Sequence, residues 1–157
     1  MWQTIRSKVQ ARKTAVGFLG ALLIHLMVLG QPSSAEQGFV VIVNLSNPLS
    51  AVPREELSRI FLKKSTKWED GSRTEPVDLA ESSPVRARFS QSVHGRDTTA
   101  IKAFWQKMIF SGRDVPPAEL ASTAEVIAFV AARRGAVGYV SEGTSVGERV
   151  KVIQIVP

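Results

Sequence analysis

The chain has 157 residues, of which 20 are Lys or Arg and 14 are Asp or Glu, giving a formal net charge of +6. It contains no cysteine, which excludes thiolate zinc sites and cysteine nucleophiles. Its two histidines are His25 and His94, and neither lies in a recognisable metal-binding or catalytic motif. The composition therefore predicts no metal site, no cofactor and no enzyme.

The first 35 residues have the three-part layout of a secretory signal peptide. Basic residues and no acid occupy the first fourteen positions, residues 15–30 are apolar, and Ser33 and Ala35 stand at the −3 and −1 positions of a cleavage site. The apolar run is shorter than the roughly 20 residues of a membrane span. We therefore expect a periplasmic protein cut after Ala35, with an uncleaved membrane anchor as the alternative.

Removal of residues 1–35 leaves residues 36–157, a length that suits one compact domain. This part of the chain has 16 basic and 14 acidic residues, so its net charge is only +2. Nucleic-acid binding relies on a strong excess of positive charge. The sequence therefore predicts one domain with no nucleic-acid partner.

In the first half of this domain, the pattern indicates strand, helix and strand. The unbroken apolar run at 38–43 is typical of a strand buried on both faces, as in a parallel sheet. Residues 54–64 have helical spacing, with acids early and lysines late, which complements the helix dipole. A short extended segment follows at 75–79, so a βαβ unit is expected.

The second half is mostly helical and ends in two strands. Helices are predicted from Pro84 to Gly95 and from residue 98 to Gly112, the latter with its apolar stripe at Ile101, Phe104, Trp105, Met108 and Ile109. Ser122 and Glu125 have capping-box spacing and begin a third helix. Residues 136–140 and 150–156 read as strands. The fold class is thus a single α/β domain over 36–157.

The stretch AESSPVRARFS, residues 80–90, is the strongest candidate for a binding site. Ser82 or Ser83 can cap a helix whose first residue is Pro84. The free amide of Val85 and the guanidinium of Arg86 could then bind a small oxyanion together with the two serines. The alternative, and the commoner situation for such a stretch, is a capped surface helix with solvated arginines.

The stretch from residue 40 to residue 71 resembles the phosphate-type periplasmic substrate-binding proteins of ABC importers. The matching features are Asn44, Asn47-Pro48, Ile60-Phe61, Lys64 and Trp68. Later segments, FWQKMIFSGRDVPP at 104–117 and VAARRGAVGYVSEG at 130–143, are similar to the same family. The resemblance spans nearly all of residues 36–157 and is greatest for a short, single-lobe group of the family.

The resemblance implies a single lobe of the type II periplasmic binding protein fold, with a mixed sheet flanked by helices. The strands at 38–44 and 150–156 would lie side by side. It also implies a non-enzymatic protein that recognises a small oxyanion, phosphate first, for uptake or sensing. A membrane transporter or another periplasmic protein would be its partner, and pairing of two copies would be one way to rebuild a cleft.

The chain departs from the family at the anion-binding turn. Ser83 matches the family's serine, but Leu79, Pro84 and Val85 stand where the family has arginine, glycine and threonine. Pro84 also lacks an amide hydrogen that could reach an anion. These departures leave a second hypothesis open, a periplasmic protein-interaction module derived from a binding-protein lobe that no longer binds an anion.

Overall fold

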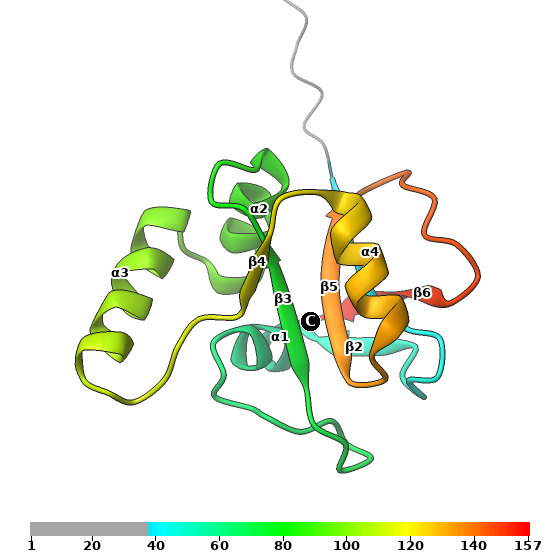
Figure 1. Cartoon of the computed structure of the whole chain (residues 1–157), viewed down its shortest axis with the longest axis horizontal. Helices are drawn as coiled ribbons and strands as arrows, with labels where there is room; N and C mark the ends of the chain where they lie inside the picture. Colours follow the sequence, from blue (N-terminus) through cyan, green and yellow to red (C-terminus); the bar gives the residue numbers. More distant parts are fainter. Residues whose placement is uncertain (1–37) are drawn as a thin grey trace, which may run out of the picture. The chain divides into compact units, whose positions relative to one another are not determined.

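The computed structural model describes residues 38–157, which form one compact unit (Figure 1). The predicted signal segment lies outside the described residues. The elements in chain order are β1 Phe39–Asn44, β2 Ala51–Pro53, α1 Arg54–Phe61, β3 Glu75–Leu79, α2 Pro84–Phe89, a π-helical turn η1 Ser90–His94, α3 Thr98–Phe110, β4 Ala118–Leu120, α4 Thr123–Ala132, β5 Ala136–Ser141 and β6 Val150–Val156. None of the helices within 38–157 is long and apolar enough to cross a membrane.

The strands form one mixed sheet in the order β2-β6-β1-β5-β3-β4. Strand β1 runs antiparallel to both of its neighbours, β5 and β6, whereas β3 is parallel to β5 and to β4. The first and last strands of the domain, β1 and β6, therefore lie side by side, as the resemblance implied. The predicted fold class, a single α/β lobe with a mixed sheet, is confirmed.

The expected βαβ unit is wrong. β5 is inserted between β1 and β3, and β1 is antiparallel to it, so β1 and β3 are neither adjacent nor parallel. The apolar run of β1 reflects its burial at the centre of the sheet, where Val41, Ile42 and Val43 are almost fully buried. A strand covered on both faces has the same composition whichever way its neighbours run.

Two adjacent residues of β5 define the layers above and below the sheet, because successive side chains of a strand point to opposite faces. On one face, Gly138 lies under α4, where an added Cβ would be 2.7 Å from Val126. On the other face, the ring of Tyr139 stacks on Phe89 of α2 with centroids 3.9 Å apart. Helix α4 thus covers one side of the sheet, and α1 and α2 cover the other (Figure 1).

The helix ends follow the capping signals of the sequence. The capping box of Ser122 and Glu125 is formed at the start of α4, and Ser83 is the N-cap of α2. Gly95 and Gly112 adopt positive φ where the η1 turn and α3 end. The segment 84–94, predicted as one helix, is α-helical only to Phe89 and widens into the η1 turn.

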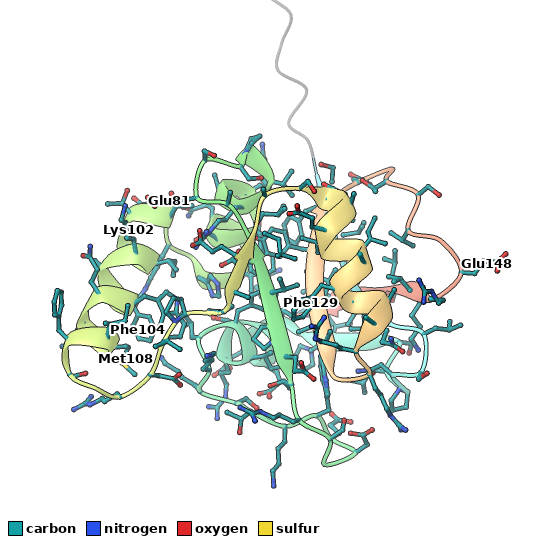
Figure 2. All side chains as sticks on the ribbon, viewed as in Figure 1. Glu81, Lys102, Phe104, Met108, Phe129 and Glu148 are labelled. Atoms are coloured by element: carbon teal, nitrogen blue, oxygen red, sulfur yellow. The ribbon has the colours of Figure 1, made fainter. Side chains whose placement is uncertain are left out.

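Helix α3 stands apart from the sheet, at one end of the domain in Figure 1. It contacts η1, and its Ile101 and Trp105 form a small separate cluster with Leu62 at the end of α1. Figure 2 shows the half-buried Phe104 and Met108 on this helix. Ile109, predicted to belong to the apolar stripe, instead has 49% of its surface exposed.

Candidate functional site

The turn between β3 and α2 is built by its own sequence. The Ser83 amide donates to the carbonyl of Ala80 at 2.9 Å, which closes a tight turn after the strand. The Ser83 hydroxyl then accepts from the amide of Arg86, and Pro84 occupies the first helical position. Because Ser83 already serves as the N-cap, its hydroxyl is partly committed to the helix that it starts.

The four predicted ligand-binding residues lie close together along this turn but differ in exposure. Ser82 is exposed, Ser83 is half-buried, and Val85 and Arg86 are buried. The expectation of solvated arginines is therefore wrong for Arg86, whose side chain is only 9% exposed. Val85 and Arg86 both join the side of α2 that packs towards the sheet.

The Arg86 guanidinium is held by the protein itself. Its Nη1 donates to the backbone carbonyl of Leu79 at 2.7 Å and to the carboxylate of Glu119 at 2.6 Å. Its Nη2 lies 3.3 Å from the carboxylate of Asp78. The Arg86 guanidinium, which has five N–H donors, is thus surrounded by three acceptors from β3 and β4. Two of these acceptors are carboxylates.

Asp78 and Tyr139 extend this network into the core. The Tyr139 hydroxyl donates to the Asp78 carboxylate and lies 3.4 Å from the amide of Leu79, which donates to it. Burial raises the pKa of Asp78, while the positive charge of Arg86 and the Tyr139 hydroxyl oppose that rise. Burial also raises the pKa of Tyr139, so its hydroxyl stays protonated and remains a donor.

The charges around the turn are unfavourable for an anion. Burial by itself lowers the pKa of Arg86, but the nearby Asp78 and Glu119 more than reverse this and raise it, so the guanidinium stays charged. Its single positive charge faces two carboxyl groups. Glu81 adds a carboxylate at the mouth of the turn, where it pairs with Lys102 of α3 at 3.0 Å (Figure 2).

Sequence reasoning missed the three residues that determine the state of Arg86. An aspartate within an otherwise apolar strand, as at Asp78, was an available signal, because a buried carboxylate requires a partner. Glu119 carried no local signal, since β4 is a three-residue strand placed beside β3 only by the fold. Tyr139 reads as an ordinary core aromatic in its strand.

Elsewhere within 38–157, the side chains offer little for catalysis or metal binding. No group of three or more potential metal ligands occurs in this part of the chain. The Ser58 hydroxyl and Nδ1 of His94 are 2.9 Å apart, with Ser58 in the middle of α1. Burial, together with nearby Arg96, Arg86 and Lys64, lowers the pKa of His94 to about 4.

Three grooves on the surface of residues 38–157 have linings that do not include the Ser82–Arg86 turn. One of about 590 Å³ lies between α4 and residues 146–149, and its lining is mainly apolar. Another, of about 480 Å³, lies beside the start of β3 and includes Lys63 and Arg73. The third, of about 330 Å³, borders β2 and Trp68.

Solved structures of proteins from phosphate transport contain a similar fold. The domain is similar to an ABC-type phosphate transport receptor from Vibrio cholerae, with a TM-score of 0.60 and 23% identity over 76% of this chain and 46% of that one. It is also similar to a phosphate ABC transporter substrate-binding protein with bound phosphate from Clostridium perfringens, with a TM-score of 0.59 and 17% identity over 76% and 45%. PstS from Borrelia burgdorferi gives a TM-score of 0.52 and 13% identity over 76% and 47%.

These similarities confirm the predicted fold, that of one part of a phosphate-type substrate-binding protein. The chain spans less than half the length of the solved structures that it matches. No protein-family model matches the chain, and no curated protein sequence matches it with significance.

Proposed function

We propose that the domain is a non-enzymatic, exported binding-protein lobe that works as a protein-interaction module and takes no phosphate at the Ser82–Arg86 turn. Its fold, shared with transport receptors that are about twice as long, supports a binding-protein origin. The observation that carries the proposal is the Arg86 guanidinium, buried between Asp78 and Glu119. An oxyanion here would have to displace a carboxylate or sit beside it.

The departures in the turn support the same conclusion. Val85 offers an amide but no hydroxyl, Pro84 offers no amide hydrogen, and Glu81 places a further negative charge nearby. Ser82 is exposed, and a hydrogen bond that competes with water contributes little net affinity. The partner would be a periplasmic protein or a membrane transporter component.

Oxyanion recognition, phosphate first, is the second candidate. It is favoured by Ser82, which is exposed, and by Ser83, which is half-buried at the start of a helix. The similar receptor from Clostridium perfringens has bound phosphate, a fact about that protein which motivates the test for this one. Under this hypothesis Ser82, Ser83, the amide of Val85 and Arg86 would bind the anion.

Thermal unfolding of residues 36–157 with and without phosphate separates the two hypotheses. At about 10 mM phosphate, a site with a dissociation constant of about 100 μM would stabilise the domain by about 2.7 kcal/mol. We expect no stabilisation beyond that of potassium chloride at equal ionic strength.

The matched variant is Ser83→Gly, which removes the hydroxyl but keeps an acceptable N-cap. Stabilisation of the wild type by phosphate that disappears in Ser83→Gly would establish the oxyanion site and contradict the interaction-module proposal. Stabilisation that is equal in the two proteins would place the anion elsewhere on the domain.

A further inference from the structure

The end of α3 carries an unusual concentration of exposed apolar side chains. Five large hydrophobic residues within 38–157 are exposed, and three of them, Ile109, Phe110 and Val115, lie within seven positions. We call these three residues the α3 tip. Phe110 is the most exposed of the five, with 89% of its surface open to solvent.

Phe110 lies on the side of α3 that faces away from the buried residues of the helix. Helix α3 buries Ile101 and Trp105 in a cluster with Leu62, and Phe110 follows Ile101 by nine positions, about 180° around the helix. The helix then ends at once, because the Gly112 and Arg113 amides donate back to the carbonyls of Ile109 and Met108. The fold therefore presents Phe110 outward.

The charge on this part of the surface is positive overall, since Asp114, which follows Arg113, is paired with Lys63 at 3.4 Å. Helix α3 contains two lysines and no acid, and Arg113 follows it. Lys102 pairs with Glu81, but Lys107 and Arg113 form no ion pair with any residue of 38–157. Lys107 precedes Phe110 by three positions, so the two side chains are neighbours on the helix surface.

We infer that the α3 tip inserts into the surface of an anionic phospholipid bilayer, with Lys107 and Arg113 contacting the headgroups. An aromatic and two aliphatic side chains flanked by basic side chains are suited to the interfacial region of a membrane. Anionic lipid attracts such basic residues electrostatically. This inference does not depend on whether the Ser82–Arg86 turn binds an anion.

The size of the α3 tip favours a bilayer over a protein partner at this position. Three exposed side chains provide on the order of a few hundred Å² of apolar surface. A stable protein interface usually needs roughly 800 Å² from each partner. Shallow insertion into a fluid surface requires no matching pocket and no further contact area.

The test is co-sedimentation of residues 36–157, which contain the whole described core, with vesicles of phosphatidylcholine and phosphatidylglycerol in equal amounts. We expect binding to these vesicles and much weaker binding to vesicles of phosphatidylcholine alone. Phe110→Ser should reduce binding at least ten-fold. The double variant Lys107→Gln, Arg113→Gln should reduce it by about five-fold per charge, and added salt should reduce wild-type binding.

Val152→Ser is the matched control, since it removes an exposed apolar side chain from β6, away from α3 (Figure 1). It should bind vesicles like the wild type, and thermal unfolding should show that every variant is folded. Absence of binding to anionic vesicles, or binding that Phe110→Ser leaves unchanged, would overturn the inference. Sedimentation velocity without lipid adds a further outcome: a dimer that Phe110→Ser abolishes would assign the α3 tip to a second copy instead.

Discussion

Nη1 of Arg86 lies 2.6 Å from the carboxylate of Glu119, across the junction of α2 with β4. This contact joins a helix to an edge strand that is only three residues long. Together with Asp78, it makes Arg86 a structural cation at the position where an anion-binding group was expected. The stability of this corner of the domain should therefore depend on Arg86 far more than on any exposed arginine.

Replacing Arg86 with Met should lower the free energy of unfolding by about 3–5 kcal/mol, because the buried carboxyl of Asp78 loses its partner. Urea denaturation of the folded domain measures this change. The control Arg59→Met removes an exposed pair with Glu56 and should cost less than about 1 kcal/mol. Equal costs for the two variants would contradict a structural role for Arg86.

The stability of the domain should fall as the pH drops from about 6.5 to 4, because of His94. Its folded pKa is about 4, below the ordinary value of 6.5, so in this window the unfolded chain binds a proton that the folded domain does not. The contribution of His94 to the free energy of unfolding is fully present above pH 6.5. It is lost on acidification, by about 3 kcal/mol at most.

Urea denaturation at several pH values tests this expectation. His94→Gln cannot titrate and keeps a polar group near Ser58, so its stability should depend less on pH than that of the wild type. Parallel pH profiles for the two proteins would assign the acid sensitivity to other groups.

Lys63 should be a site where glycine is stabilising. It is the only non-glycine residue within 38–157 with positive φ, at 52°. This conformation costs a side-chain-bearing residue roughly 1–2 kcal/mol. Two effects offset part of the gain. Glycine loses more conformational entropy on folding than lysine does, and the partly exposed ion pair with Asp114 is lost.

We expect Lys63→Gly to raise the free energy of unfolding by about 0.5–1 kcal/mol. The neighbouring variant Lys64→Gly, at a position without positive φ, should lower it instead. If Lys63→Gly proves the more destabilising of the two in chemical denaturation, the ion pair with Asp114 outweighs the backbone strain.

Gly138 should tolerate no side chain. An alanine Cβ there would lie 2.7 Å from Val126 and 3.0 Å from Val77, inside the contact between α4 and the sheet. Overpacking of this kind costs about 1–3 kcal/mol. Gly38→Ala is the control, since its Cβ would meet only the side chain of Glu142, which can move aside.

Thermal or chemical unfolding should also show that Val126→Ala compensates for Gly138→Ala, making the double variant less destabilised than the sum of the two single variants. Strict additivity would mean that the strain of Gly138→Ala is not relieved at Val126.

Local patterns in the sequence predicted most of the elements. Helical periodicity and end signals located α1, α3 and α4, and the capping box of Ser122 and Glu125 formed as expected. The short strands β2 and β4 were missed, because three residues paired along an edge leave no periodic pattern. The strand-helix-strand order was recognised, but not the insertion of β5 between β1 and β3.

The candidate site combines local interactions with contacts between distant parts of the chain. A capped helix start at Ser83 and Pro84 follows from the sequence alone, because those interactions span only a few residues. The role of Arg86 depends on the tertiary fold, since Asp78 reaches it from β3 and Glu119, 33 residues further along the chain, reaches it from β4. The charge on a guanidinium is a property of the sequence, whereas the carboxylates that surround it depend on how distant strands are brought together.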